Sequence, residues 1–299
     1  DQIGGVKYNL GFSLADYKSK VLQFTDMTNV PFPGNLGRGD RIENWNGNAK
    51  NYYLVGKSLS PVYVFQTDGI FQTQEEVDAY YEMYYWNADH TAPKAGNIIP
   101  APADSGTGRL RPGARKVVDL DGDGVITKDD IYYAGDRDPH LTFTIKAGLE
   151  WKGIDVSAFF QGVGNQVVLR QGQIPYLWRT NYVMQNKTYM GKTWTPENTG
   201  AEYTIASRDQ NFNAWNYQYK DVSLQKNRYI RLKSLVVGYT LPKQWTAKAG
   251  LNKVRLYFSG DDLWEWTKVK DGYDPEFGEE TNNSFPFSRL LSFGVDVTF

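Results

Sequence analysis

Several long segments of the chain alternate apolar and polar residues with a period of two. In the segment 141–151 the apolar positions are Leu141, Phe143, Ile145, Ala147, Leu149 and Trp151, with polar residues or glycine between them. The alternation resumes at 154–160 after Lys152-Gly153, and it occurs again at 6–14 and at 291–299. Because successive side chains of a strand point to opposite faces, this pattern predicts strands with one apolar face. The short break at Lys152-Gly153 predicts a tight hairpin.

The predicted strands are long, which bears on the environment of the sheet. Further strands are expected at about 17–28, 52–66, 228–241 and 252–266, which brings the total to roughly eight. Runs of ten or more residues exceed the ~5–6 residues usual in globular sheets and match the ~9–11 residues that cross a bilayer obliquely. Within 228–241 the apolar phase changes between Leu232 and Leu235, which predicts a β-bulge or a departure from the membrane. A helix is expected at 74–85, where Thr73 can cap the first turn.

Composition agrees with two kinds of β protein. The chain contains 21 Tyr, 15 Phe and 9 Trp among 299 residues, yet its mean hydropathy is −0.56. No run approaches the ~18 apolar residues of a membrane-spanning helix. A polar average with many aromatic residues is typical of a porin-like barrel and also of a sugar-binding β-sandwich. The formal net charge of −1 argues against a nucleic-acid partner, and the absence of cysteine excludes thiolate metal sites and disulfide bonds.

A short acidic motif, DLDGDGVITKDD at 119–130, has the spacing of a twelve-residue calcium loop. The expected ligands are the carboxylates of Asp119, Asp121, Asp123 and Asp130 together with the backbone carbonyl of Val125. Hard oxygen ligands at this spacing suit Ca²⁺. Aspartate in place of glutamate at the twelfth position shortens the last ligand. The alternative is an acidic turn that joins two strands without an ion.

Aromatic residues gather in the long segment 165–227, among Asn, Gln and Arg. Flat rings beside polar groups can stack on sugars and hydrogen-bond their hydroxyls, so this segment is a candidate to face a ligand or a partner protein. The alternative is that the rings pack the segment against itself. The candidate residues are Tyr176, Trp178, Tyr182, Trp194, Trp215 and Tyr217.

Signals for catalysis are poor, and we expect the protein not to be an enzyme. The two histidines, His90 and His140, lie far apart in the sequence and no nucleophile motif accompanies them. Several carboxylates lie between 261 and 280, but they stand beside Gly and Pro in a stretch with the composition of a solvated loop. Neither a phosphate-binding loop nor a dinucleotide fingerprint is present.

Seven stretches of the chain, taken in order, resemble the SusC/RagA family of TonB-linked outer-membrane transporters. They are YVFQTDGIFQTQEEVDAY (63–80), VVDLDGDGVITKDDIYYAGDRDPHLTF (117–143), GIDVSAFFQGVGNQ (153–166), TWTPENTGAEY (193–203), NRYIRLKSLVVGYTLPK (227–243), VRLYFSGDDLWEWTKVKDGYDPEF (254–277) and FPFSRLLSFGVDVTF (285–299). The resemblance is weakest at 29–50, 85–112, 165–192 and 204–226, where ligand-facing loops of different members would differ.

The resemblance implies an all-β fold: residues 1–299 would be the carboxy-terminal portion of a large antiparallel transmembrane barrel with long extracellular loops. Barrels of this class have about 22 strands, so the plug and the earlier strands would lie outside this chain. The implied function is TonB-dependent import of a bulky nutrient, an oligosaccharide or a peptide, across the cell outer membrane. A SusD-like surface lipoprotein would be the partner. The terminal Phe299 would be the signal for barrel assembly.

In this interpretation Leu291, Phe293, Val295 and Val297 face lipid, while Ser292, Asp296 and Thr298 face the lumen. Two rivals remain open. One is a secreted, calcium-stabilised carbohydrate-binding β-sandwich, and the other is an all-β glycosidase.

Overall fold

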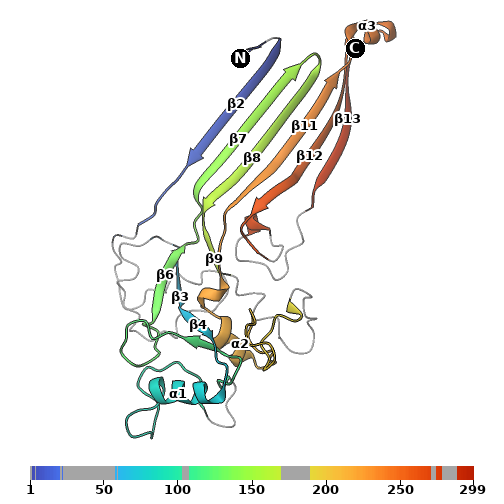
Figure 1. Cartoon of the computed structure of the whole chain (residues 1–299). Coiled ribbons are helices and arrows are strands. Elements are labelled where there is room, and N and C mark those ends of the chain that lie inside the picture. Colours follow the sequence, from blue (N-terminus) through green and yellow to red (C-terminus); the bar gives the residue numbers. More distant parts are fainter. Residues whose placement is uncertain are drawn as a thin grey trace.

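A computed structural model of the chain describes residues 2–3, 5–20, 22, 58, 60–102, 108–169, 189–270, 274–277 and 288–299. A seven-stranded antiparallel sheet extends from a lobe of short strands and helices (Figure 1). In spatial order its strands are β1 (Gln2–Ile3), β2 (Val6–Ala15), β7 (His140–Trp151), β8 (Ile154–Asn165), β11 (Tyr229–Thr240), β12 (Lys253–Thr267) and β13 (Leu290–Thr298). Both termini lie at the end of the sheet opposite the lobe (Figure 1).

Most of the predicted strands are confirmed. The alternating segments 6–14, 141–151, 154–160 and 291–299 form β2, β7, β8 and β13, and the segments 228–241 and 252–266 form β11 and β12. The predicted strand at 52–66 is shorter within the described residues, since β3 covers only Pro61–Phe65 and lies in the lobe. Residues 17–20 are not a strand, and most of the remaining segment up to 28 lies outside the described residues.

Strand register gathers the apolar side chains on one face of the sheet. One row of paired residues crosses six strands, and a second row two residues away is similarly apolar. Phe293 is 82% exposed and Leu10 is 75% exposed, so this face has no cover among the described residues. The first row is Tyr8, Leu149, Val156, Val237, Phe258 and Phe293, and the second is Leu10, Ala147, Ala158, Leu235, Gly260 and Leu291.

The opposite face carries the charged side chains of the same strands. Arg255 on β12 donates from Nε to Asp155 on β8 at 2.9 Å and from Nη1 to Asp296 on β13 at 3.1 Å. Gly238 on β11 lies between β8 and β12, and a Cβ atom there would come within 2.5 Å of Asp155 Oδ1. A glycine is therefore required for the ion pair to cross β11.

The predicted irregularity in β11 is a β-bulge. The pairing of β11 with both β8 and β12 shifts between Leu232 and Ser234. Asp262 on β12 has a φ of 53° at the same level, which is uncommon for a residue other than glycine. The bulge keeps Leu232 level with Trp264, so the apolar face continues beyond it.

The described residues of the lobe form three two-stranded sheets and two main helices. The sheets pair β3 with β6 (Ile131–Asp136), β4 (Thr67–Ile70) with β5 (Arg115–Val117), and β9 (Val167–Leu169) with β10 (Leu224–Lys226). The predicted helix is confirmed as α1 (Gln74–Tyr84), and the Thr73 hydroxyl accepts a hydrogen bond from the Glu76 N–H at 3.3 Å. The second helix, α2, spans Gln210–Tyr217. Both helices contribute to an aromatic-rich core that includes Phe71, Tyr81, Phe212 and Trp215.

Four shorter helical segments lie among the described residues. α3 (Lys243–Thr246) and the 3₁₀ turn Ala247–Ala249 connect β11 to β12 at the end far from the lobe, and a 3₁₀ turn at Asp221–Ser223 precedes β10. Another 3₁₀ turn, Pro275–Phe277, follows β12. Among the described residues, no helix is long and apolar enough to cross a membrane.

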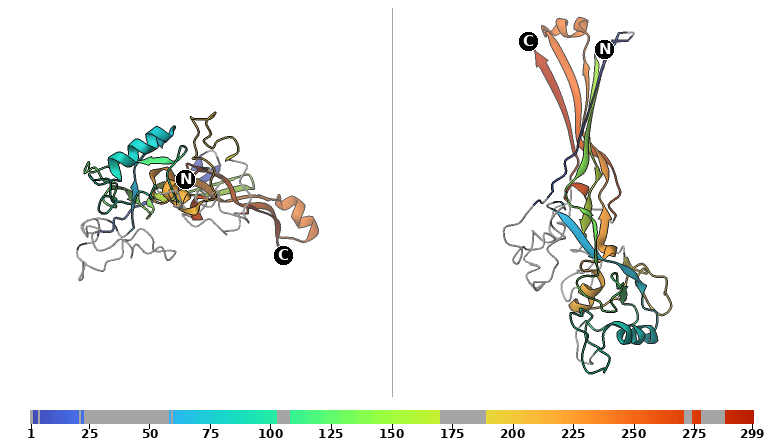
Figure 2. Two further views of the ribbon diagram at one scale, coloured as in Figure 1. Left: turned by 90° about the horizontal axis from the view of Figure 1, so that it is seen from below. Right: turned by 90° about the vertical axis from the view of Figure 1, so that its left-hand side faces the viewer.

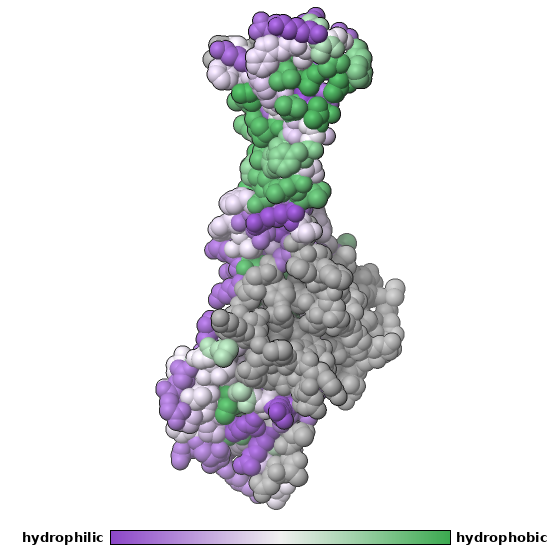
Figure 3. All heavy atoms as spheres, turned by 90° about the vertical axis from the view of Figure 1, so that its right-hand side faces the viewer, coloured by the Kyte–Doolittle hydropathy of each residue, from purple (hydrophilic) through white to green (hydrophobic). Residues whose placement is uncertain are grey.

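The two ends of the molecule differ in surface character. Seen from the side, the sheet is a single curved layer with the lobe at one end (Figure 2). Hydrophobic residues gather over the strands, whereas hydrophilic residues dominate the lobe and the far tip (Figure 3). A β-sandwich needs two sheets packed face to face, and this layer has no facing sheet within the described residues.

We predict that a charge on the apolar face of β13 destabilises the complete protein in a bilayer. The substitution Leu291→Lys, in the central row of the apolar face, should cost ~2–4 kcal/mol, because the ammonium cannot be hydrated near the membrane centre. The measurement is the free energy of unfolding of the full-length protein in lipid vesicles. Ser292→Lys on the opposite face of the same strand is the control and should cost much less. Equal losses for the two variants would contradict the assignment of the faces.

Candidate functional site

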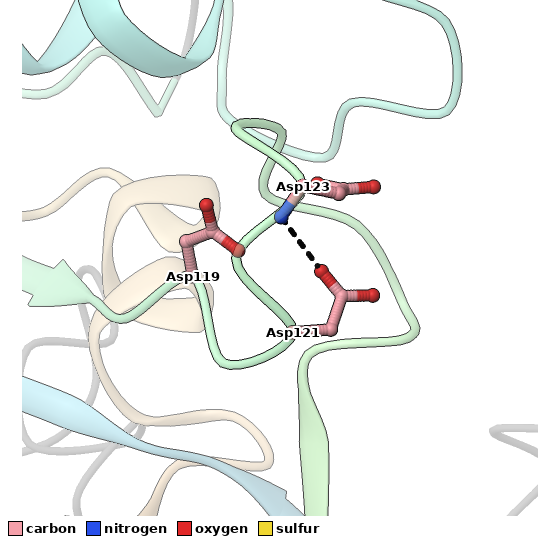
Figure 4. A group of neighbouring side chains, drawn as sticks. All are labelled: Asp119, Asp121 and Asp123. Atoms are coloured by element: carbon pink, nitrogen blue, oxygen red, sulfur yellow. Dashed lines mark hydrogen bonds between the residues drawn. The ribbon is translucent and has the colours of Figure 1, made fainter.

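The acidic loop between β5 and β6 brings three carboxylates together. Oxygen atoms of Asp119, Asp121 and Asp123 lie within 4.8 Å of one another (Figure 4). Asp119 accepts hydrogen bonds from the N–H groups of Gly122 and Gly124, both at 2.8 Å. Both glycines have φ above 70°, which bends the backbone around the Asp119 side chain. Three of the four predicted carboxylate ligands therefore converge.

The fourth predicted carboxylate, that of Asp130, does not belong to this group of three. Its side chain is fully buried and accepts hydrogen bonds from the N–H groups of Leu120 at 2.6 Å and Thr127 at 2.7 Å. Burial raises the pKa of Asp130, although these N–H groups act in the opposite direction. The Asp130 carboxylate thus fastens the start of the loop to its end and is not among the converging group. Sequence spacing could not reveal this, because it fixes position along the loop and not side-chain direction.

Neighbouring elements hold the loop in place. Ile126 is fully buried in the lobe core, and its carbonyl accepts from the Ile98 N–H at 3.0 Å. The Lys94 ammonium donates to the carbonyl oxygens of Gly124 at 2.7 Å and Met83 at 2.6 Å, which joins the loop to the end of α1. The N–H of Val125 donates to Asp123 Oδ1 at 2.8 Å. The converging carboxylates are consequently set on a packed support, with Asp121 and Asp123 open to solvent.

The aromatic candidates that the structure describes are core side chains. Trp215 is buried and its indole N–H donates to the Arg115 carbonyl at 3.0 Å, while Trp194 donates to Gln72 Oε1 at 2.8 Å. Tyr217 is buried and its hydroxyl lies 2.8 Å from that of Thr204. These three rings follow the packing alternative, because their polar tips are satisfied inside the lobe. Tyr176, Trp178 and Tyr182 lie outside the described residues.

A buried lysine accompanies these rings and gave no signal in the sequence. The Lys220 ammonium lies 4.4 Å from the centre of the Phe65 ring and 5.2 Å from that of Trp215. It donates to the Gln218 carbonyl at 3.2 Å. Burial lowers the pKa of Lys220 to about 7, and the nearby Asp221 offsets part of this effect. Lys220 thus changes charge near neutral pH inside the lobe core.

Carboxylates of β12 and of the turn after it are paired with cations, which corrects the expectation of a solvated loop. Arg231 on β11 has a side chain only 2% exposed; it contacts Glu265 and reaches Asp274 at 2.6 Å and Glu276 at 3.2 Å. Lys233 lies 2.9 Å from Asp262 and 3.1 Å from Glu276. These ion pairs hold the 3₁₀ turn Pro275–Phe277 against the start of β11. The partners are 29–45 residues apart in the sequence, so no local sequence pattern predicts them.

The similar sequences and the similar solved structures point to the same kind of protein. No protein-family model matches the sequence. TonB-dependent receptor P3 of Formosa agariphila is 28% identical over 218 residues, which are 68% of this chain and 21% of that receptor. TonB-dependent receptor P26 of the same organism is 28% identical over 266 residues, covering 85% of this chain and 24% of the receptor. The chain therefore spans less than a quarter of the length of these curated relatives.

Solved structures agree over the whole chain. The RagAB peptide importer in its closed-closed state matches with a TM-score of 0.64 and 18% identity, covering 100% of this chain and 28% of that chain. The open-open state matches with a TM-score of 0.62 and 16% identity. In sequence the chain is similar to part of two TonB-dependent receptors, and its fold matches part of the RagAB importer barrel. It belongs to the outer membrane, and its sheet is an arc of the transporter barrel.

This kinship removes the two rival interpretations. The relatives are receptors and importers, so the glycosidase alternative is wrong. The single layer with an exposed apolar face fits the wall of a transporter barrel, in which that face meets lipid. By the same logic, the charged face with Arg255 and Arg231 belongs to the inside of the transporter.

Proposed function

We propose that the complete protein imports a bulky nutrient across the outer membrane, driven through TonB. The observation that carries this proposal is the match of the whole chain to the RagAB importer barrel, together with the kinship to TonB-dependent receptors. The remaining strands and the plug would come from other segments of the complete protein. Closure is required because an open sheet edge in lipid leaves backbone N–H and C=O groups without partners.

We infer that the lobe lies outside the cell and contacts a SusD-like lipoprotein. Outer-membrane barrels have short turns on the periplasmic side and long loops outside. Here Lys152-Gly153 makes a short turn at the end opposite the lobe, and the lobe is built from the described parts of the long segments between β2 and β7 and between β8 and β11. A folded lobe with its own core offers a firm surface for a partner protein.

The substrate that we propose is an oligosaccharide, on the basis of the sequence around Tyr176, Trp178 and Tyr182, where these aromatic residues stand among Asn, Gln and Arg. The second candidate is a peptide, because the matching solved structures are of a peptide importer. For the acidic loop we propose one bound Ca²⁺, held by Asp119, Asp121 and Asp123. The Val125 carbonyl and, after a change of its side-chain direction, Asp130 would complete the ligand set. The role of the ion would be structural, since it stabilises a loop that carries no acid, base or nucleophile pair.

The transport proposal is tested with the full-length protein and its lipoprotein partner in the outer membrane of a host that lacks its own copy. Labelled oligosaccharide should accumulate in cells with intact TonB and should stop accumulating when the tonB gene is deleted. A labelled peptide library in the same cells distinguishes the second candidate. Uptake of neither class, or uptake that is independent of TonB, would contradict the proposal.

For the calcium proposal, the double substitution Asp121→Ala, Asp123→Ala should abolish calcium binding while the protein still inserts into the membrane. Removing both carboxylates leaves too few charged oxygen ligands for the ion. The measurement is calcium titration by calorimetry on the full-length protein. Asp89→Ala, an exposed aspartate of the same lobe, is the control and should bind normally. In a crystal structure, metal–oxygen distances of about 2.3–2.6 Å would identify calcium, whereas about 2.0–2.1 Å would identify magnesium.

We also propose that Phe299, which is 85% exposed just after β13, is recognised by the barrel-assembly machinery. Deletion of Phe299 should lower the amount of folded protein in the outer membrane, because the aromatic residue that follows β13 is lost. The measurement is the fraction of heat-modifiable, folded barrel in isolated membranes. Thr298→Ala, which alters the neighbouring residue alone, should assemble normally. Normal assembly of the deletion variant would refute this role.

A further inference from the structure

The histidine at the start of β7 joins three elements where the lobe meets the sheet. His140 Nδ1 lies 2.8 Å from Asp16 Oδ1, just beyond the end of β2. His140 Nε2 lies 3.5 Å from Asp136 Oδ2, at the end of β6. The histidine side chain and that of Asp136 are largely buried, with 11% and 10% of their surfaces exposed. One ring therefore links two sheet strands to a lobe strand.

Two carboxylates beside the two ring nitrogens favour a positively charged ring. A carboxylate accepts hydrogen bonds and cannot donate them, so a ring nitrogen bonds to it only when that nitrogen carries a hydrogen. A neutral imidazole has a single N–H, and only the imidazolium has two. The pKa of His140 is raised, first by the hydrogen bond to Asp16 and then by the charges of Asp16 and Asp136, which outweigh burial. His140 lies at the lobe end of the apolar strands, outside the band formed by their lipid-facing side chains.

Few other titratable groups face this contact among the described residues. Tyr133 hydrogen-bonds the Asp136 side chain, and burial together with Asp136 raises the pKa of Tyr133 to about 12. Tyr133 therefore stays neutral across the physiological range. The Ser58 hydroxyl also donates to Asp136. The Tyr17 ring lies 6.0 Å from the imidazole, centre to centre. The histidine is thus the group that titrates near neutral pH.

The backbone next to His140 is strained. Leu141 has a φ of 54°, in the left-handed region that a leucine rarely adopts. Such a conformation persists where surrounding contacts over-determine it. The Leu141 N–H points to the same Asp16 oxygen at 3.4 Å, and the Leu141 side chain packs beside Gly164, where a Cβ atom would come within 2.9 Å. The Asp16 carboxylate therefore contacts both the ring and the strained residue.

We propose that His140, Asp16 and Asp136 form a proton-controlled clasp that fixes the lobe to the rim of the barrel sheet. With the ring protonated, both carboxylates are bridged and the β6-to-β7 connection is held. Deprotonated His140 has one N–H for two carboxylates, so it can keep a hydrogen bond to only one of Asp16 and Asp136. The strained backbone at Leu141 is then less well stabilised by its surroundings. The pKa of His140 is higher in the folded state than in the unfolded state. The stabilisation that its contacts give to the junction of lobe and sheet is therefore complete below the unfolded-state pKa, and it disappears as pH rises through the folded-state pKa.

The test is hydrogen exchange of the backbone amides of β6 and β3 in the full-length transporter, corrected for the intrinsic exchange rate. His140→Gln keeps one donor and cannot carry the charge. At about pH 6 the lobe strands of this variant should open about threefold more often than those of the wild type, and at about pH 9 the two should be equal. Comparing the proteins at each pH cancels the effect of Lys220, which changes charge in the same range in both.

The other histidine of the chain provides a matched control. His90 is more than half exposed beside Glu82 in the lobe, so His90→Gln should match the wild type at both pH values. Asp16→Asn removes the group that raises the pKa most, and it should move the pH midpoint of the effect to a lower value. A ratio between His140→Gln and wild type that does not change with pH would overturn the proposal. So would an equal pH-dependent change in His90→Gln, or an unmoved midpoint in Asp16→Asn.

Discussion

Backbone hydrogen bonding between long antiparallel strands is the constraint on which this structure depends. In lipid no water can satisfy an N–H or C=O group, so the strands must satisfy one another. Pairing from β1 to β13 does this for the interior of the sheet and fixes one register for every strand. Since side chains alternate along a strand, that register places residues such as Leu10 and Phe293 on one face and Lys7 and Arg255 on the other. The apolar outside and the charged inside follow from the same pairing.

The charged face has its own physical requirement. A charge that leaves water must find a partner, because the cost of desolvation otherwise exceeds any gain. Arg255 pairs with carboxylates from β8 and β13, and Arg231 pairs with carboxylates from β12 and from the turn that follows it. These contacts tie non-adjacent parts of the chain together and also hold the turn Pro275–Phe277 over the sheet. The charged face of the sheet is therefore stabilised by ion pairs between side chains, whereas the opposite face consists of apolar side chains.

The lobe follows the rules of a soluble domain. It buries aromatic side chains from α1, α2 and the short strands around Ile126, and it satisfies their polar tips internally. Hydrogen bonds to the Asp130 carboxylate fix its acidic loop, and the loop presents the carboxylates of Asp119, Asp121 and Asp123. The lobe and the sheet meet at His140, whose ring contacts Asp16 after β2 and Asp136 of the lobe strand β6. These two contacts couple a water-facing unit to a membrane wall.

The sequence by itself determined the elements that repeat locally. A period of two located β2, β7, β8 and β13, a phase change located the bulge near Leu232, and spacing located the group of Asp119, Asp121 and Asp123. These features depend on residues a few positions apart, which the linear order records. Only the tertiary structure decided that Trp215 packs in the core, that Asp130 turns to backbone N–H groups, and that Arg231 meets Asp274. Such outcomes depend on which distant segments meet and on how deeply each side chain is buried, and the linear order of residues does not encode either one locally.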